Sequence, residues 1–254
     1  MVDEAWTTRT LLDIVFPSGA KALAIRLNDL DDATLALDAL GLRRPCPTLV
    51  LVGGAGDMGD SQMKYLRPLF VNILTPLAAD LAAAVVDGGT DAGVMRLMGQ
   101  ARAETGAKFP LIGVVASGTV TLPGADSQSN NKVVLEPHHT HFLLVPGCEW
   151  GDESPWLASI ASVLSGEAPS VTVLVDGGEI ALEDVERSIE HQRPVVVVAN
   201  TGRAADRLTA ALRGEPSDDR AQALAASGLL RVEDHAEASH RLADVIREAL
   251  STGG

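Results

Sequence analysis

Four short apolar runs, each closed by a turn that contains glycine, constrain the fold of this chain more than any other feature. The turns are Gly53-Gly54, Gly88-Gly89, Gly177-Gly178 and Asn200-Thr201-Gly202. An amphipathic segment follows each turn; after Gly88-Gly89 we expect a helix with Thr90 or Asp91 as its N-cap. This alternation of Val-rich runs and helical segments predicts an α/β fold: a Rossmann-like, doubly wound, mostly parallel sheet with helices on both faces.

The four turns are expected to meet at one edge of that sheet. In doubly wound sheets, ligands bind outside the carboxyl ends of the strands, near the point where the strand order reverses. Glycine lets the backbone approach a ligand closely, and the free N–H groups of a first helical turn attract anions. The sequence therefore predicts a pocket for a phosphate-bearing nucleotide.

Sequence patterns outside these four turns predict further strands, helices and loops. We expect an edge strand over Lys21–Leu27 and a short helix over Asp32–Leu40, closed by Gly41. The segment Ser61–Ala84 is helical in pattern, with proline at positions 68 and 76 dividing it. Thr119–Lys132 has the composition of a loop.

Composition limits the partners of the chain. Its formal charge of −14 disfavours binding to nucleic acid and to anionic membrane surfaces. No apolar run approaches the roughly 18–20 residues that a membrane helix needs, and the acidic, polar N-terminus is unlike a signal peptide. Cys46 and Cys148 form no metal or redox motif, so we expect a reduced, cytoplasmic protein without membrane insertion.

Arg203 is a candidate phosphate-binding cation, because it follows the last glycine turn and opens a helix in a chain with few cations. The alternative is a surface ion pair with Asp206 at i+3. His138, His139 and His141 suggest a metal site at first sight. On an extended segment, however, His139 and His141 share one face and His138 the other, and no further ligands complete a tetrahedral set. We expect no metal and one imidazole hydrogen-bonded inside the pocket.

Two groups of carboxylates could perform general acid–base chemistry or could simply complement helix dipoles. They are Glu149, Asp152 and Glu153 in one loop, and Glu179, Glu183 and Asp184 after Gly178. The chain contains no G-x-S-x-G nucleophile motif, and GGAGDMG lacks the Lys-Ser/Thr pair of a P-loop.

Six stretches together resemble the SLOG superfamily, in particular the LSDAT-type branch shared by prokaryotic stand-alone proteins and the cytosolic N-terminal region of melastatin-type TRP channels. They are VGGAG (Val52–Gly56), VVDGGTDAGVM (Val85–Met95), PLIGV (Pro110–Val114), LEPHHTHFLLV (Leu135–Val145), LVDGGEIALEDV (Leu174–Val185) and PVVVVANTGRAAD (Pro194–Asp206). The resemblance implies one SLOG-like domain over 1–254, with a core over about 47–212 and flanking extensions 1–46 and 213–254.

The resemblance also implies a ligand such as ADP-ribose and a set of binding residues. Gly53, Gly54 and Ala55 would line the first turn; Gly88, Gly89, Thr90, Asp91 and Gly93 would hold phosphate or ribose; Gly202 and Arg203 would lie opposite. Val94, His141, Gly177, Gly178, Glu179, Asn200 and Thr201 complete the candidate set. Asp91 stands where the channel motif has Asn, and an ionised carboxylate only accepts hydrogen bonds, which favours a ribose hydroxyl over a phosphate.

A second branch of the superfamily, the cytokinin-activating phosphoribohydrolases, carries PGGxGTxxE. Here Ile180 and Ala181 replace the Gly-Thr pair, and Asp184 occupies the acidic position. We therefore expect a cytoplasmic protein that binds or senses ADP-ribose, cyclic ADP-ribose or an NAD-like ligand, needs no cofactor and can self-associate. The alternatives are a glycosidic-bond hydrolase using Asp184, Glu179 or Glu153, and a scaffold with a vestigial pocket.

Overall fold

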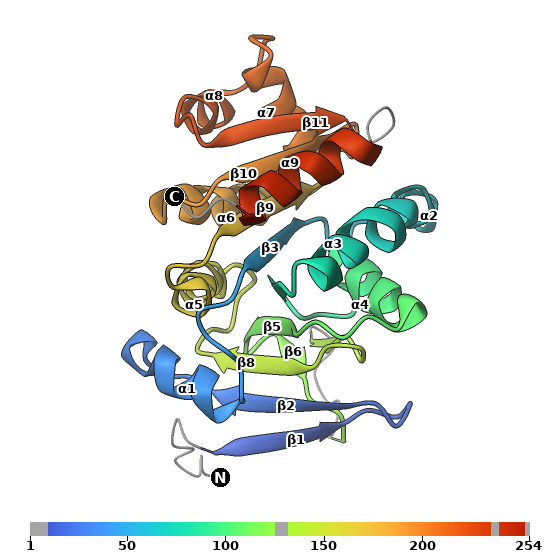
Figure 1. Cartoon of the computed structure of the whole chain (residues 1–254), viewed down its shortest axis with the longest axis vertical. Helices are drawn as coiled ribbons and strands as arrows, with labels where there is room; N and C mark the ends of the chain where they lie inside the picture. Colours follow the sequence, from blue (N-terminus) through green and yellow to red (C-terminus); the bar gives the residue numbers. More distant parts are fainter. Residues whose placement is uncertain (1–9, 125–131, 235–238, 252–254) are drawn as a thin grey trace.

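The computed structural model describes residues 10–124, 132–234 and 239–251. One nine-stranded sheet, in the order β1-β2-β8-β5-β4-β3-β9-β10-β11, runs through the molecule from end to end (Figure 1). All neighbouring strands pair in parallel except β1 and β2, which are antiparallel. The prediction of a Rossmann-like, mostly parallel sheet is confirmed.

The strands of this sheet are β1 (Leu11–Val15), β2 (Lys21–Arg26), β3 (Thr48–Gly53), β4 (Ala84–Asp87), β5 (Leu111–Ala116), β8 (His141–Val145), β9 (Ser170–Val175), β10 (Val195–Ala199) and β11 (Leu230–Asp234). The strands β6 (Val120–Thr121) and β7 (Val133–Val134) form a separate parallel pair. Four central strands carry side chains that are buried on both faces, which explains their continuous apolar sequences.

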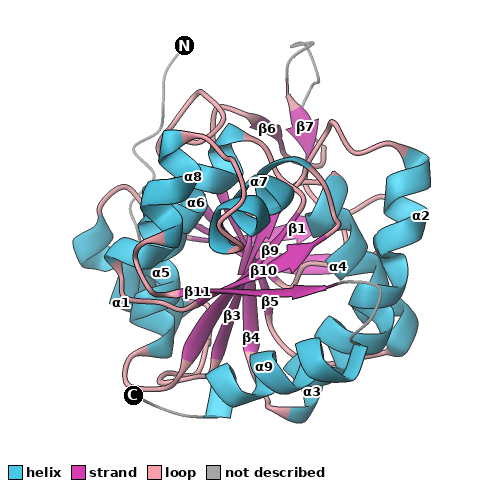
Figure 2. Ribbon diagram, turned by 90° about the horizontal axis from the view of Figure 1, so that it is seen from above, coloured by secondary structure: helices cyan, strands magenta, loops and turns pink. Residues whose placement is uncertain are grey.

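Helices cover both faces of the sheet, as Figure 2 shows. One layer contains α1 (Ala33–Ala39), α5 (Ser154–Ser165), α6 (Glu179–Glu190), α7 (Arg203–Leu212) and α8 (Asp219–Ala225). The other contains α2 (Asp60–Leu69), a π-helical turn (Phe70–Leu74), α3 (Thr75–Asp80), α4 (Gly93–Thr105) and α9 (Ser239–Ser251). Successive residues of β3 point to opposite faces of the sheet. Val50 and Val52 pack against the layer that contains α5 and α6, and Leu49 and Leu51 pack against the layer that contains α2 and α4.

The strand order reverses beside β3. From β3 the chain moves outward through β4, β5 and β8, and then α5 carries it back so that β9 forms on the other side of β3. The crevice between β3 and β9 is therefore the switch point at which this class of sheet binds ligands. The turns that follow β3, β4 and β9 all border it.

Three local predictions needed correction. The strand over Lys21–Leu27 is not at the edge, because β1 pairs outside it. Helix α4 begins at Gly93 with Ala92 as N-cap, because Thr90 is held in an extended bridge with Leu135. The helical segment predicted over Ser61–Ala84 ends at Asp80, and Ala84 already belongs to β4; between the two prolines, a π-helical turn separates α2 from α3.

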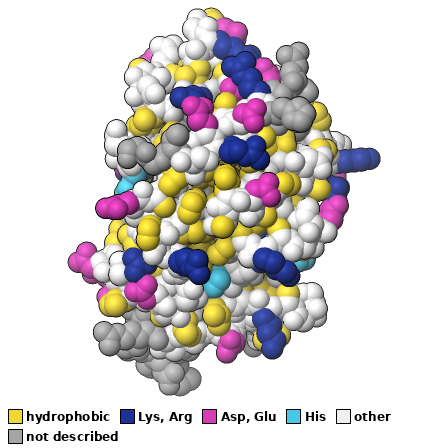
Figure 3. Space-filling model, in the orientation of Figure 1, with side chains coloured by type: hydrophobic (Ala, Val, Ile, Leu, Met, Phe, Trp, Pro, Cys, Tyr) yellow, Lys and Arg dark blue, Asp and Glu magenta, His cyan; other side chains and the backbone are white. Residues whose placement is uncertain are grey.

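The described helices include none that is both long enough and apolar enough to cross a membrane. On the face drawn in Figure 3, hydrophobic side chains gather near the centre, and basic and acidic side chains are interspersed around them. That face therefore presents no continuous basic surface of the kind that tracks a nucleic-acid backbone.

The close approach of α4 to the turn after β3 gives a test of the packing at the switch point. Gly93 has φ +46°, and a Cβ atom there would lie 1.9 Å from the carbonyl oxygen of Gly54. We expect Gly93→Ala to lower the free energy of unfolding by roughly 1–3 kcal/mol beyond the cost of its left-handed backbone, because the added methyl group meets rigid main chain.

Gly106→Ala is the matched control, since Gly106 has φ +68° and open space around its Cβ position. It should cost only about 1–2 kcal/mol, the penalty of the left-handed conformation. Urea denaturation of both variants measures the difference. Equal losses would contradict a tight contact between α4 and the β3 turn.

Candidate functional site

A cavity of about 570 Å³ opens at the switch point, a size typical of small-molecule sites. Its walls come from the end of β3 and the turn after it, from the turn between β4 and α4, from the loop before α5 and from the first turns of α6 and α7. The lining residues are Leu51, Val52, Gly53, Ala55, Gly56, Asp57, Gly88, Thr90, Ala92, Met95, Val133, Trp150, Glu153, Leu157, Gly178, Glu179, Ile180, Ala181, Asp184 and Arg203.

Glycines at the base of the cavity let three elements touch through their backbones. A Cβ atom on Gly53 would lie 2.0 Å from the carbonyl oxygen of Val175 in β9. The Gly54 N–H donates to that oxygen at 3.1 Å, and the Gly54 carbonyl accepts from the Val94 N–H of α4 at 2.9 Å. The amide that we expected to face a phosphate at the start of α4 is therefore already bonded within the protein.

An ion pair between Asp176 and Arg203 closes the other side of the crevice. Asp176 directly follows β9 and is fully buried, and Arg203 opens α7. The guanidinium donates through Nε to Oδ1 at 3.0 Å and through Nη2 to Oδ2 at 2.8 Å. Both residues have positive φ, +58° and +37°, a strain that proteins hold where surrounding contacts fix the geometry.

The remaining nitrogen of Arg203 faces the cavity. Its Nη1 donates to Oδ2 of Asp57 at 3.0 Å, and the Asp57 side chain is 86% exposed. A Cβ atom on Gly178 would lie 4.0 Å from the same nitrogen, which places it beside the N-terminus of α6. N–H groups of a first helical turn have no acceptor inside their helix, so Arg203 Nη1 and the start of α6 together form a corner with the donors that an anion requires.

The alternative ion pair between Arg203 and Asp206 is wrong. Oδ1 of Asp206 instead accepts a hydrogen bond from the Asn200 N–H at 2.8 Å. The Thr201 side chain is also hydrogen-bonded within the protein. Its Oγ1 donates to the Val198 carbonyl and accepts from the Asp176 N–H at 2.8 Å. Asn200, Thr201 and Gly202 thus shape the turn that presents Arg203, and they do not line the cavity.

Two carboxyl groups, those of Glu153 and Asp184, line the wall of the cavity that α5 and α6 build. Glu153 precedes α5, and its Oε2 accepts from the Gly151 N–H at 3.1 Å; Asp184 lies on the second turn of α6. Burial, together with the charges of Glu153 and Glu183, raises the pKa of Asp184 to about 7. Burial likewise raises the pKa of Glu153. This wall therefore resists negative charge, and its Asp184 carboxyl group takes up a proton near neutral pH.

Glu179 lines the cavity, and ion pairs join its carboxylate to arginines of α7 and α8. One oxygen pairs with Arg207 and the other with Nη1 of Arg220 at 3.2 Å. Arg207 also binds Asp218 at 2.9 Å. A phosphate at the start of α6 would therefore meet the Glu179 charge already neutralised in part.

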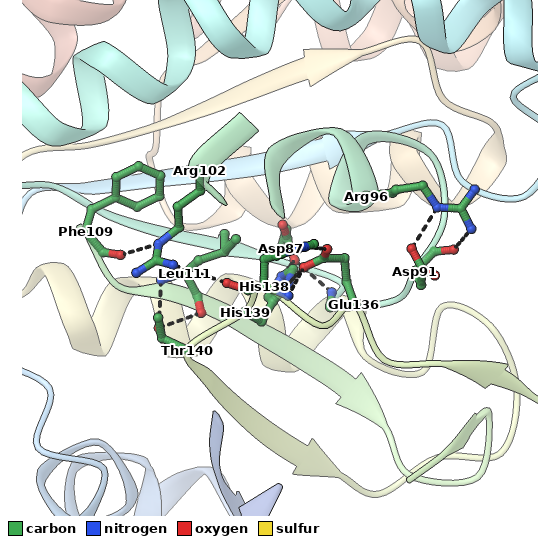
Figure 4. A network of polar contacts seen from close by, with 11 residues as sticks. Asp87, Asp91, Arg96, Arg102, Phe109, Leu111, Glu136, His138, His139 and Thr140 are labelled. Atoms are coloured by element: carbon green, nitrogen blue, oxygen red, sulfur yellow. Dashed lines mark hydrogen bonds and ion pairs between the residues drawn. The ribbon is translucent and has the colours of Figure 1, made fainter. Parts of the chain in front are cut away.

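A buried polar network of Asp87, Glu136 and His139 hydrogen-bonds the turn between β4 and α4 (Figure 4). His139 bridges two carboxylates, with Nε2 at 2.8 Å from Oδ1 of Asp87 and Nδ1 at 2.9 Å from Oε2 of Glu136. The same Asp87 oxygen accepts from the Gly89 N–H at 2.7 Å, and the Gly89 carbonyl accepts from the Glu136 N–H at 3.0 Å. This turn carries the lining residues Gly88 and Thr90, so the network fixes part of the cavity wall.

The network holds His139 in its charged form. Burial alone lowers the pKa of His139, but the adjoining carboxylates of Asp87 and Glu136 outweigh it and raise the value to about 9. Burial alone raises the pKa of Glu136, but its hydrogen bonds with His139 and His138 bring the value below the usual range. A buried imidazolium between two carboxylates is stabilising only while all three partners are present.

The expected alternation of the histidines is wrong, because His138 lies in a turn before β8. His138 and His139 both bind Glu136, whereas His141 contacts Oγ1 of Thr140 at 2.8 Å. His141 lies outside the cavity lining, and burial lowers its pKa to about 4. In the described part of the chain, no group of three or more His, Cys, Asp or Glu residues is arranged to hold a metal ion.

The structure brings seven of the candidate binding residues to the cavity: Gly53, Ala55, Gly88, Thr90, Gly178, Glu179 and Arg203. The others lie outside its lining: Gly54, Gly89, Asp91, Gly93, Val94, His141, Gly177, Asn200, Thr201 and Gly202. Asp91 pairs with Nε of Arg96 at 2.7 Å, so its carboxylate is engaged by a neighbouring cation. Sequence reasoning missed Asp57 and Trp150; the only signal for Trp150 was an aromatic residue within an acidic, glycine-containing loop.

A protein family described as SLOG in TRPM, prokaryote, matches residues 46–244. The chain belongs to this family. The resemblance inferred from the six sequence stretches is thereby confirmed.

Animal ion channels are among the relatives. The mouse transient receptor potential cation channel subfamily M member 2 is 25% identical over 202 residues, which cover 65% of this chain and 13% of the channel. The subfamily M member-like 2 channel of Nematostella vectensis is 27% identical over 225 residues, 73% of this chain and 14% of the channel. The chain thus spans about one seventh of the length of these relatives.

The crystal structure of TM1055, a structural-genomics target, resembles this fold with a TM-score of 0.51 at 21% sequence identity. The similarity covers 79% of this chain and 98% of TM1055. It supports the architecture of the sheet and its helices.

The buried network predicts a stability change that depends on pH. His139→Gln removes the cation between Asp87 and Glu136, and we expect it to lower the free energy of unfolding by about 3 kcal/mol. Because the pKa of His139 is raised from 6.5 to about 9, this stabilisation is complete below pH 6.5 and is lost as the pH rises through 9. Denaturation of both proteins between pH 6 and roughly 10 measures the difference.

His191→Gln serves as the control, since His191 lies at the surface beside two serine hydroxyls. Its pKa is lowered, chiefly by burial, so it contributes no stability that disappears over this pH range. A gap between wild type and His139→Gln that stays constant with pH would contradict a charged His139.

Proposed function

We propose that this protein binds a phosphate-bearing nucleotide derivative, with ADP-ribose, cyclic ADP-ribose and NAD as the first candidates. The observation that carries the proposal is the corner formed by Arg203 Nη1 and the start of α6 inside a cavity at the switch point. The guanidinium is held in place by Asp176, so little conformational freedom is lost when it meets a phosphate oxygen. Membership of the SLOG family is consistent with a nucleotide-related ligand.

Sensing without hydrolysis is the function that we infer. Asp184 and Glu153 are the carboxyl groups that a glycosidic-bond hydrolase would use here, and a protonated Asp184 could serve as a general acid. Ile180 and Ala181 replace the Gly-Thr pair of the hydrolase motif, however, and Glu179 is engaged by two arginines. We therefore regard the protein as a cytoplasmic binding module that needs no further cofactor and reports its ligand by self-association or to a partner.

Thermal denaturation and calorimetry with ADP-ribose, cyclic ADP-ribose, NAD and AMP test this function. A ligand present at 100 times its dissociation constant should stabilise the fold by about 2.7 kcal/mol. Absence of any shift would favour a vestigial pocket. Release of a free base or of nicotinamide by the wild type, abolished in Asp184→Asn, would contradict a purely binding role.

Asp57→Asn tests the anion-binding corner without disturbing the buried ion pair. The exposed Asp57 carboxylate occupies Nη1 of Arg203, so its neutralisation should strengthen ADP-ribose binding by roughly two- to tenfold. Asp244→Asn, which removes the same charge from the exposed face of α9, should leave the affinity unchanged. Weaker binding by Asp57→Asn would show that the carboxylate is itself a ligand contact.

A further inference from the structure

Four carboxyl groups of the described chain line the cavity, and they differ in whether a cation accompanies them. Asp57 pairs with Arg203, and Glu179 pairs with arginines of α7 and α8. Glu153 and Asp184, on the wall built by α5 and α6, have no basic partner among the residues that the structure describes. Negative charge on this wall is therefore not balanced by the described part of the protein.

The groups that act on Asp184 come from both helices of this wall. Glu153 precedes α5 and Glu183 lies on α6, and the charges of both disfavour ionisation of Asp184. The Ser154 hydroxyl group at the start of α5 acts in the opposite sense and lowers the Asp184 pKa in part. Glu183 is itself paired with Arg187 at 3.5 Å and does not line the cavity. The two carboxyl groups that a ligand would meet here are those of Glu153 and Asp184.

The hydroxyl group of Ser154 provides a second, independent sign of a ligand at this wall. Ser154 has no exposed surface, and its Oγ has no hydrogen-bond partner among the described residues. The large majority of buried polar side-chain atoms are hydrogen-bonded, to protein or to a bound molecule. An unpaired hydroxyl group beside two carboxyl groups without a cation is an arrangement that a positively charged ligand group would complete.

We propose that Glu153 and Asp184 bind the positive charge of a cationic ring in a ligand whose phosphate lies at Arg203, as in an oxidised nicotinamide nucleotide. This inference rests on the proposed function and narrows the class of ligand. A ring with a fixed positive charge supplies the cation that these two carboxyl groups lack. The opposite charges of the two regions also set the direction in which the ligand lies.

The spacing along α6 suits such a ligand. Helix α6 begins at Glu179, directly after Gly178, whose Cβ position lies 4.0 Å from Nη1 of Arg203. Asp184 follows five residues after Glu179, about 7–8 Å along the helix axis. In a pyridinium ribonucleotide one ribose separates the phosphate from the charged ring nitrogen, a distance of the same order. The phosphate would meet the donors of the first turn, and the ring the carboxyl groups of the wall.

The oxidised and reduced forms of NAD test the inference, because they share both phosphates and differ in the charge of one ring. Calorimetry at about pH 8 should show oxidised NAD binding the wild type roughly tenfold tighter than NADH, the change expected for one charge-assisted contact. Asp184→Asn should remove most of this preference. Glu153→Gln, which keeps an acceptor for the Gly151 N–H, should also reduce it, so that a folding defect in one variant leaves the other as a test.

Glu190→Gln is the matched control. It removes the same charge from the far end of α6, where the Glu190 side chain is 53% exposed and lies outside the cavity lining. This variant should keep the full preference for oxidised NAD. The comparison separates a local contact from the repulsion between the protein's overall negative charge and the more negative NADH.

The pH dependence gives a second readout that a purely structural role of Asp184 would not produce. A proton on Asp184 competes with a cationic ring, and the pKa of Asp184 is about 7. The affinity for oxidised NAD should therefore rise about fourfold from roughly pH 6.5 to pH 8, whereas the affinity for NADH should not rise. Asp184→Asn should abolish the rise. The phosphates of NAD are ionised throughout this range and do not contribute to it.

The possible results separate this inference from the proposed function. Equal affinities of the wild type for the two forms, or a preference that persists in both Asp184→Asn and Glu153→Gln, would overturn the inference while leaving the binding function intact. Failure of the wild type to bind oxidised NAD, NADH and ADP-ribose would overturn both.

Discussion

The ion pair between Asp176 and Arg203 is the interaction on which the site depends. It joins the end of β9 to the start of α7 and lies directly over the point where the strand order reverses. A carboxylate with no exposed surface is costly unless a cation and hydrogen bonds compensate it, and here two guanidinium nitrogens do so. A Cβ atom on Gly202 would lie 2.8 Å from Oδ1 of Asp176, so only glycine lets this turn approach the pair. The pair fixes one face of the guanidinium and leaves the other directed at the cavity.

The opposite wall is held by a different arrangement of charge. Asp87, His139 and Glu136 form a buried chain of alternating sign that hydrogen-bonds the turn after β4. A Cβ atom on Gly99 would lie 2.1 Å from Oε2 of Glu136, so the absence of a side chain there lets α4 approach this chain. Both walls of the cavity are thus positioned by buried carboxylates, Asp176 on one side and Asp87 with Glu136 on the other, an arrangement that keeps the site in shape before binding.

Much of the fold, but only part of the site, follows from the sequence. Val-rich runs and glycine turns are patterns within short stretches of sequence. These patterns were enough to predict the central strands and the edge of the sheet at which those strands end. Arg203 was recognised, but its partner Asp176 was not, because 27 residues separate them and only the pairing of β9 with β10 brings them together. Trp150 reaches the cavity because the chain leaves β8, three strands away from β3, and its next loop extends to the switch point, which no local pattern encodes. Several glycines expected to face a ligand, Gly54 and Gly93 among them, instead let backbones touch.

The charge of the protein determines how such a cavity could bind an anion. With a formal charge of −14, the chain offers no broad positive field to attract a phosphate, and Asp176 already offsets much of the Arg203 charge. Arg203 Nη1 is in contact with the carboxylate of Asp57, so a phosphate bound there would replace one anion with another. The free energy of that exchange is a small difference, because an exposed ion pair contributes at most about 1 kcal/mol. Under the proposed function, selectivity must then come from groups that a carboxylate side chain cannot satisfy together, such as the N–H groups at the start of α6, which suit an anion with several oxygens.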